Sequence, residues 1–565
     1  MNEEKTLDLV FLWHMHQPDY RDRLGNEFRL PWTYLHAIKD YTDMAAHFER
    51  HPRVRAVVNF VPVLVDQLED YAGQFARREF RDPLLRLLAH PDMEQLTVAE
   101  RKLLLGSCFR SNHLTMLAPF PRYQRLYDLY KRLEEQGDAA QGYLSGAYFS
   151  DLVTWYHLAW TGETERRNRP QLAELMSKGE AFDHDDRLLL ISIMGDMIAG
   201  LVPRYRALAA RGQIELSATP YAHPLAPLLL DFASARDSEP NIALPRAAAY
   251  PGGRARVAAH IERAITSHTQ RFGAPPGGFW PAEGAVSEGL LQLLGAAGGR
   301  WAASSEAVLA NSLRLTSRDL PPRKSYLYRP YRCTNAPSVT MFFRDERLSD
   351  LIGFEYAKWH GKDAAAHFVA ELEAIRDQAP PGETPLVCIF LDGENAWEYY
   401  PYNGYYFFED LYCLLEAHPR IRTTTLSAYV DHGKQSTEPL PRLCAGSWVY
   451  GTFSTWIGDP EKNRAWELLC AAKQSYDLVM ASGRLDDAAA AAAAAQLAVC
   501  ESSDWFWWFG DYNPAEAVTN FDELFRLNLE RLYQLLKLPP PAQLAEPISR
   551  GKGRPESGGT MRRAS

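Results

Sequence analysis

The chain has 565 residues, which is enough for more than one domain and a large hydrophobic core. A net charge of −10 and a pI of about 5.9 argue against nucleic acid or an anionic membrane as the main partner. Seven cysteines, an odd number without a CxxC pair, favour reduced thiols and a cytoplasmic location over a disulfide framework or a thiolate zinc site.

Short apolar runs separated by helical segments occupy most of the first 430 residues. The sequence before the first run is acidic and lacks the features of a signal peptide, and no run is long enough to predict a membrane span. Repeated strand–helix alternation predicts a parallel sheet, and the number of runs indicates a closed α/β barrel. The predicted strands are residues 7–13, 55–61, 212–216, 278–280, 300–309 (with its helix), 338–343 and 387–391.

Two regions depart from this alternation. Residues 66–211 show mainly amphipathic helical periodicity and are too long for a simple crossover, so they are interpreted as a helical insertion in a catalytic region that spans residues 1–433. Residues 434–538 are predicted to form a C-terminal helical domain, in which an alanine run favours helix. Prolines end the last helix, and the polar residues 539–565 are predicted to be a disordered tail.

Polar side chains collect where the predicted strands end. The first strand ends at His14 and His16, the third leads to His223, the fourth leads to Glu283 and the last ends at Asp392. In an α/β barrel these strand ends meet at the face that carries the active site. Two carboxylates from different strands are the minimum required for glycoside cleavage, and aromatic residues near them suit the packing of sugar rings.

The segment of residues 385–404 is the most informative. Its apolar run ends at Asp392, and Glu394, Trp397 and Glu398 follow directly. An Asp-Gly dipeptide also favours a hairpin turn, but the residues after it do not alternate as a second strand would. Glu394 could hold Asp392 or a histidine in place, whereas Glu398 could lie on the face of a helix.

A metal site is the main alternative. His14 and His16 have a metal-ligand spacing, because alternate side chains on a strand point to the same side. With His223 and Asp392 as further ligands, the chain would be a metal-dependent polysaccharide deacetylase or amidohydrolase. No second ligand pair supports that hypothesis, so the sequence favours a site without metal or other cofactor. A non-catalytic glycan-binding protein is a third alternative, which the presence of both carboxylates disfavours.

Five segments in order resemble the signature regions of glycoside hydrolase family 57. They are residues 14–18 (HMHQP), 212–229 (GQIELSATPYAHPLAPLL), 278–288 (GFWPAEGAVSE), 390–400 (FLDGENAWEYY) and 446–467 (GSWVYGTFSTWIGDPEKNRAWE). The resemblance implies an incomplete seven-stranded β/α barrel followed by a helical domain. It also implies a retaining enzyme that acts on α-glucan or maltooligosaccharide, of the α-amylase or amylopullulanase type. A 4-α-glucanotransferase or glucan branching enzyme is the alternative within the family.

The matching motifs imply that Glu283 is the nucleophile and Asp392 the general acid/base. Chemistry then requires an ionised Glu283 and a protonated Asp392, whose pKa should be raised by burial and by the charge of Glu283. The residues expected to bind sugar are His14, His16, His223, Trp280, Glu394, Trp397, Trp448, Trp456 and Asp459.

Trp448, Trp456 and Asp459 would reach the site from the helical domain, and core or capping roles remain an equal alternative for them. The cluster at residues 504–508 is interpreted as a hydrophobic seam between barrel and helices, with a sugar platform as its alternative.

Overall fold

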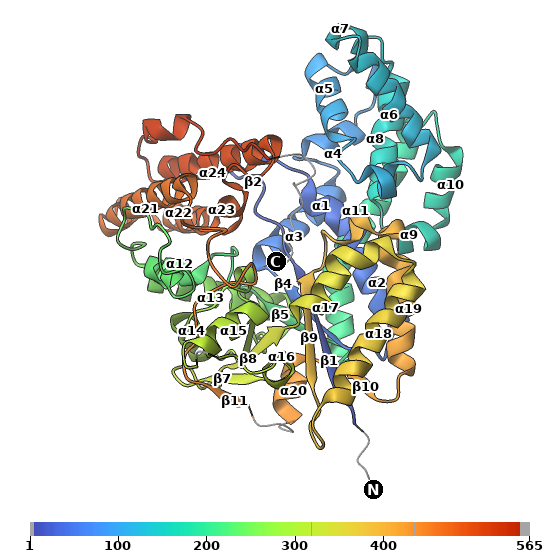
Figure 1. Cartoon of the computed structure of the whole chain (residues 1–565). Helices are drawn as coiled ribbons and strands as arrows, with labels where there is room; N and C mark the ends of the chain where they lie inside the picture. Colours follow the sequence, from blue (N-terminus) through green and yellow to red (C-terminus); the bar gives the residue numbers. More distant parts are fainter. Residues whose placement is uncertain (1–4, 318, 433–436, 554–565) are drawn as a thin grey trace.

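The computed structural model describes residues 5–317, 319–432 and 437–553 (Figure 1). Its centre is a parallel sheet formed by apolar runs that are buried on both faces, as parallel strands require. β1 pairs in parallel with β9, β4 and β10, and β4 pairs with β5. These strands are β1 (Leu7–Met15), β4 (Ala56–Phe60), β5 (Ile214–Ala218), β9 (Leu386–Asp392) and β10 (Ile421–Thr423).

A second group of strands continues the sheet. β6 pairs in parallel with β8, while β7 is antiparallel to β8 and parallel to β11. Single-residue bridges from Phe279 to Ala218 and Ala302 connect β5 with β6. Beyond β8, the Asp345 N–H donates to the Cys388 carbonyl of β9 (2.8 Å). The strands are β6 (Trp301–Ser305), β7 (Tyr331–Cys333), β8 (Thr340–Arg344) and β11 (Glu438–Leu440), and a short hairpin joins β2 (Arg21–Asp22) to β3 (Glu27–Phe28).

Helices pack against these strands on their outer side. For example, α11 and α13 contact β5, α15 contacts β6 and β8, and α17 contacts β9. The helices outside the insertion and the C-terminal region are α1 (Trp32–His36), α2 (Thr42–Arg50), α12 (Ala226–Leu230), α13 (Gly253–Phe272), α14 (Glu288–Ala296), α15 (Glu306–Arg314), α16 (Arg323–Tyr326), α17 (Glu346–Asp350), α18 (Gly361–Gln378), α19 (Tyr405–Ala417) and α20 (Leu426–His432).

A run of helices lies between β4 and β5. They are α3 (Pro62–Arg77), α4 (Pro83–Leu88), α5 (Val98–Ser107), α6 (Pro121–Glu134), α7 (Asp138–Gln141), α8 (Gly146–Trp160), α9 (Glu163–Asn168), α10 (Pro170–Lys178) and α11 (His184–Ala210). In the described part of the chain, α11 alone is long and apolar enough by length and composition to cross a membrane. Its Leu190, Ile191 and Met194 are buried, and Gly195 lets Phe75 of α3 pack closely against it.

The C-terminal helices are α21 (Pro460–Ala481), α22 (Asp487–Cys500), α23 (Asp504–Trp508) and α24 (Ala515–Leu535). They pack through aromatic rings, among them Trp466 and Phe506, whose centroids lie 4.1 Å apart. Figure 1 shows these helices and the insertion helices α4–α10 on opposite sides of the upper part of the molecule. The predicted boundary at 433–434 lies outside the described residues, and β11 after it still belongs to the sheet through its pairing with β7.

The prediction of a disordered tail from residue 539 is wrong for residues 539–553. Leu544 and Ile548 are buried, and the Ile548 N–H donates to Asp522 Oδ1 of α24 (2.8 Å). The overall polar composition led to the prediction of disorder, although the two apolar side chains of Leu544 and Ile548 are buried and the segment contacts α24. Residues 554–565 lie outside the described part of the chain.

Candidate active site

A pocket of about 510 Å³ lies where β1 and β9 end, between the insertion and the C-terminal helices. Its wall contains Trp160 of α8 on one side and Trp507 of α23 on the other. Seven of the residues predicted from the sequence line it together: His14, His16, His223, Glu283, Asp392, Glu394 and Trp448.

Glu283 is held from two directions. Ser503 Oγ donates to its Oε1 (3.1 Å), and Trp448 Nε1 donates to its Oε2 (3.2 Å). Its backbone has a φ of 59°, and two other residues that line the pocket, His223 and Asn395, have φ values of 58° and 52°. This left-handed conformation is tolerated by asparagine but unfavourable for Glu283 and His223, at a cost of about 1–3 kcal/mol each, and such strain concentrates at functional sites.

Asp392 is the last residue of β9 and lies opposite His14 in the strand register. Asn395 Nδ2 donates to its Oδ2 (3.0 Å). Burial raises the pKa of Asp392 to about 6, although the Asn395 hydrogen bond and the charge of Arg344 oppose the rise. The pKa of Glu283 rises further, to about 8, because of burial and the negative charges of Asp504 and Asp392.

These pKa values confirm one expectation and correct another. The pKa of Asp392 is raised as predicted, and burial is the cause, but the negative charge of Glu283, which was the second expected cause, is not among the contributions. The pKa of Glu283 is raised above that of Asp392, which is the reverse of the order expected for an ionised Glu283 beside a protonated Asp392. The reason is that Asp504 faces Glu283 while the guanidinium of Arg344 favours the ionised form of Asp392.

The three histidines form a buried stack of neutral rings. His14 shares one hydrogen bond with Asn59 (2.7 Å) and one with His223 (3.2 Å). The His16 and His223 rings are stacked with centroids 3.7 Å apart, and His16 Nε2 lies 2.9 Å from Asp504 Oδ1. Burial lowers the pKa of His14 and of His16 to about 3, and that of His223 well below its usual value. Neutral imidazoles can both donate to and accept from sugar hydroxyls.

The potential ligands of a metal are arranged differently from the sequence hypothesis. His16, His223 and Asp504 have ligand atoms within 4.8 Å of one another and could hold an ion. That group excludes both His14 and Asp392, which the metal hypothesis required. The absence of a metal remains a prediction.

Glu394 and Glu398 also line the pocket. Glu394 is buried, and its Oε1 accepts from the His16 N–H (3.0 Å) and from Gln17 Nε2 (3.4 Å). It therefore fixes the loop that carries His16, which is the supporting role that its position after Asp392 suggested. Burial raises the pKa of Glu398 to about 6.

Two predicted sugar-binding tryptophans lie beneath the pocket wall and do not line it. Trp280 is fully buried and packs against Trp448, with ring centroids 5.1 Å apart. Trp397 packs against Trp13 and donates from Nε1 to the Gly393 carbonyl (2.9 Å). The prediction that these two residues contact the sugar directly is therefore wrong for this pocket, because their rings pack in the hydrophobic core.

Trp456 and Asp459 likewise do not line the pocket, although Trp456 packs behind Trp507 of its wall with ring centroids 5.7 Å apart. Trp456 is fully buried, and its carbonyl accepts from Trp466 Nε1 (3.0 Å). Asp459 caps α21 by accepting from the Glu461 N–H (2.8 Å). The alternative of core and capping roles is the correct one for both residues.

The sequence reasoning missed the part of the site that comes from α23. Ser503 and Asp504 contact Glu283 and His16, and Trp507 and Trp508 line the pocket. The seam interpretation holds for Trp505, which is fully buried, but the cluster also forms a pocket wall. An acidic residue directly before a run of aromatic residues was the only local signal.

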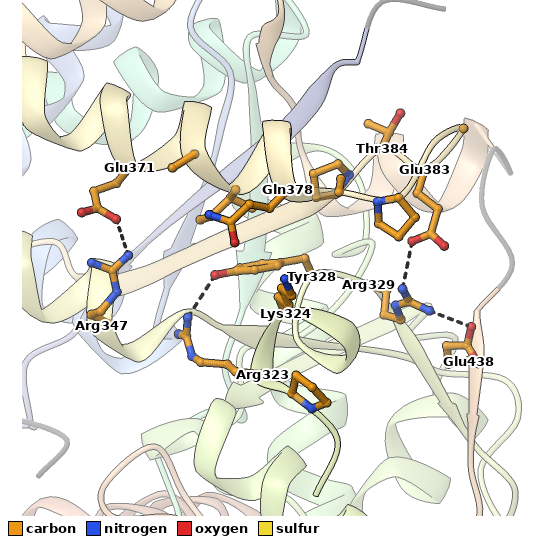
Figure 2. Close-up of a pocket in the computed structure, with 17 residues that line it drawn as sticks. Arg323, Lys324, Tyr328, Arg329, Arg347, Glu371, Gln378, Glu383, Thr384 and Glu438 are labelled. Atoms are coloured by element: carbon orange, nitrogen blue, oxygen red, sulfur yellow. Dashed lines mark hydrogen bonds and ion pairs between the residues drawn. The ribbon is translucent and has the colours of Figure 1, made fainter.

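A larger cavity, of about 620 Å³, lies at the opposite end of β9 (Figure 2). Arg329 there pairs with Glu383 (3.0 Å) and Glu438 (3.2 Å), and Arg347 pairs with Glu371. None of the predicted site residues lines it. Because its arginines are already matched by carboxylates, the smaller pocket is the better candidate for catalysis.

Two carboxyl groups in one pocket at the carboxyl end of a parallel sheet, with aromatic rings around them, are the kind of site found in carbohydrate-cleaving enzymes. The family model described as glycosyl hydrolase family 57 matches residues 10–441, and the chain belongs to this family of enzymes. The resemblance to this family is thereby confirmed, and the match covers the first four of the five segments and ends before residues 446–467. A search of curated proteins found no match.

Solved structures with the same overall fold are distant in sequence. The GH57 branching enzyme of Thermococcus kodakaraensis has a TM-score of 0.59 at 15% identity, over 94% of this chain and 90% of that one. The α-amylase AmyC of Thermotoga maritima has a TM-score of 0.56 at 14% identity, over 96% and 94%. The 4-α-glucanotransferase of Thermococcus litoralis has a TM-score of 0.52 at 13% identity, over 94% and 60%.

Proposed function

We propose that the chain is a retaining α-glucan hydrolase that cleaves α-1,4-glucosidic bonds, with α-1,6 bonds as a second substrate to test. The observation that carries this proposal is that Glu283 and Asp392 line one pocket, with two hydrogen-bond donors fixed on the buried Glu283. The α-amylase, branching enzyme and glucanotransferase that share the fold support α-glucan as the substrate class.

In the proposed mechanism, Glu283 attacks the anomeric carbon while Asp392 protonates the departing glycosidic oxygen. Asp392 then removes a proton from water, which displaces Glu283 from the sugar. With pKa values of about 8 and about 6, the pair holds one proton at neutral pH, which is the number that this mechanism needs. Because the pKa of Glu283 is raised more than that of Asp392, we propose that substrate binding shifts the proton to Asp392.

The surrounding groups are proposed to orient the sugar. The neutral rings of His14, His16 and His223 offer hydrogen bonds to hydroxyl groups. The Trp448 ring offers an apolar surface close to Glu283. The Arg344 guanidinium lies 5.2 Å from the centroid of the same ring.

We also propose that the strands form the incomplete seven-stranded barrel of the family. The path from β9 through β1, β4, β5, the Phe279 bridge, β6 and β8, with the Asp345–Cys388 hydrogen bond, supports this interpretation. The helices after residue 440 are proposed to be a C-terminal domain that completes the pocket. A cytoplasmic location is proposed because all seven cysteines are free thiols.

The experiment is incubation of the protein with maltoheptaose, amylose and pullulan, followed by separation of the products by size. Hydrolysis gives only shorter products, whereas a glucanotransferase also gives products longer than maltoheptaose and a branching enzyme introduces new α-1,6 linkages. NMR at early times should show release of the α-anomer, and initial release of the β-anomer would exclude retention.

Two variants test the roles of the carboxylates. Glu283→Ala and Asp392→Ala should each lose activity on the order of 10³-fold or more. With α-glucosyl fluoride and azide, Asp392→Ala should yield the α-glycosyl azide and Glu283→Ala the β-glycosyl azide, because azide replaces water in the first and the nucleophile in the second. The same azide anomer from both variants would contradict the assignment.

A further inference from the structure

Three exposed tyrosines lie within residues 399–406, and the first of them lines the active-site pocket. We refer to Tyr399, Tyr402 and Tyr406 as the tyrosine row. Tyr399 lines the pocket and is 45% exposed. Tyr402 and Tyr406 follow outside the pocket and are 51% and 46% exposed. Large aromatic side chains usually bury most of their surface, so three exposed rings beginning at a binding pocket indicate a surface that contacts a ligand.

The outer two rings are held in place by the helical insertion. Their centroids lie 5.4 Å apart in an edge-on arrangement. Arg167 of α9 donates from Nη2 to the Tyr406 hydroxyl (3.1 Å), and its guanidinium lies 5.2 Å from the Tyr406 centroid. Arg167 is itself fixed by Glu163 (2.7 Å). Rings fixed in this way lose little rotational freedom when a ligand binds.

The backbone that presents Tyr402 is strained. Tyr402 and Asn403 have φ values of 55° and 54°, in the left-handed region that disfavours most side chains. Asn403 suits this region and secures the turn, since it accepts from Lys39 Nζ (3.1 Å) and donates to Asp43 Oδ2 (2.8 Å). Among the described residues, no hydrogen bond of the Tyr402 side chain secures the turn, and asparagine or glycine would relieve the strain at this position. The turn therefore projects an exposed tyrosine ring at a conformational cost, which points to a role for the ring itself.

We propose that Tyr402 and Tyr406 bind remote glucose residues of a long α-glucan chain whose reacting part occupies the pocket. The proposal rests on the proposed function. Aromatic faces bind the apolar faces of sugar rings, and the phenol groups carry no charge to repel a neutral polymer. The Cα atoms of Tyr399 and Tyr402 are at most about 11 Å apart, because the two residues are three positions apart in the chain, and this span is within the reach of a few glucose units.

The test compares long and short substrates with Tyr402→Ala, Tyr406→Ala and the double variant. KM for amylose should rise about three- to tenfold per removed ring, with kcat unchanged, while KM for maltotriose stays constant. Tyr402→Asn should show the same loss for amylose and a higher Tm, because asparagine tolerates the left-handed turn. The control is Tyr143→Ala, which removes an even more exposed ring (89%) near α7 and should change neither KM.

Affinity electrophoresis in gels containing amylopectin, with every variant made in a Glu283→Ala background, measures binding without turnover. Retardation of the parent protein that the double variant loses supports the site. Unchanged amylose KM and unchanged retardation would overturn it, as would equal losses for amylose and maltotriose. A change of oligomeric state with intact amylose binding would assign the row to contacts between copies. Lack of turnover of any α-glucan by the wild type would instead refute the proposed function, and the binding assay would still decide on the tyrosines.

Discussion

Glu501 is expected to be the ionic anchor that holds the C-terminal wall of the pocket. It is fully buried after α22, three residues before Asp504, and accepts hydrogen bonds from Arg256 Nη2 (2.7 Å) and Tyr250 (2.6 Å). His260 Nε2 lies 2.7 Å from the same carboxylate. The Arg256 guanidinium and the His260 hydrogen bond lower the pKa of Glu501 from 4.5 to about 2, even though burial opposes the change.

This pKa sets the size and the pH range of the effect. A pKa lower in the folded state means that ionised Glu501 stabilises the fold above pH 4.5, and that this contribution disappears as the pH falls towards 2. The difference corresponds to about 3 kcal/mol, at 1.36 kcal/mol per pKa unit. Glu501→Gln should therefore lower the free energy of unfolding by about 3 kcal/mol at pH 7, because Arg256 loses its buried counter-charge. At pH 3, where Glu501 is already largely protonated in the unfolded chain, the loss should be about half of that or less.

Chemical denaturation of both proteins between pH 3 and pH 7 measures this difference. The control is Glu135→Gln, which changes an exposed glutamate and should alter stability by less than about 0.5 kcal/mol. Glu501→Gln should also raise KM for α-glucan, since Ser503 and Asp504 follow it directly. A difference between wild type and Glu501→Gln that is constant with pH would refute the reasoning.

Three further predictions concern the same site. The profile of kcat/KM against pH should fall below about pH 6 and above about pH 8. Asp504→Asn should move the alkaline limb of this profile to lower pH, since it removes a negative charge facing Glu283. An unmoved limb would show that Asp504 does not act on Glu283. Activity should survive exhaustive dialysis against EDTA, and a loss reversed by zinc would implicate His16, His223 and Asp504 as metal ligands. A chain ending at residue 440 should be insoluble or inactive, as judged by solubility and maltoheptaose turnover, because it lacks Trp448 and the α23 wall; full activity would mean that the helices are an independent appendage.

Local sequence patterns determined the sheet and its carboxylates. The apolar run before Asp392 forms β9, and the run before His14 forms β1, because residues buried on both faces of a parallel strand must be continuously apolar. The polar residue that ends each run then lies at the strand end, which placed Glu283 and Asp392 in one pocket. The order of the five motifs was sufficient to recognise the family.

The tertiary structure alone decided which other side chains reach the pocket. His16 and Asp504 are separated by 488 positions and Glu283 and Ser503 by 220, and no local periodicity reports contacts over such distances. An aromatic side chain in a motif can point into the core as readily as into a cleft, which is why Trp397 was misplaced. The relative pKa values of the two carboxylates also depend on Asp504, a charge that folding brings to Glu283 from the far end of the chain.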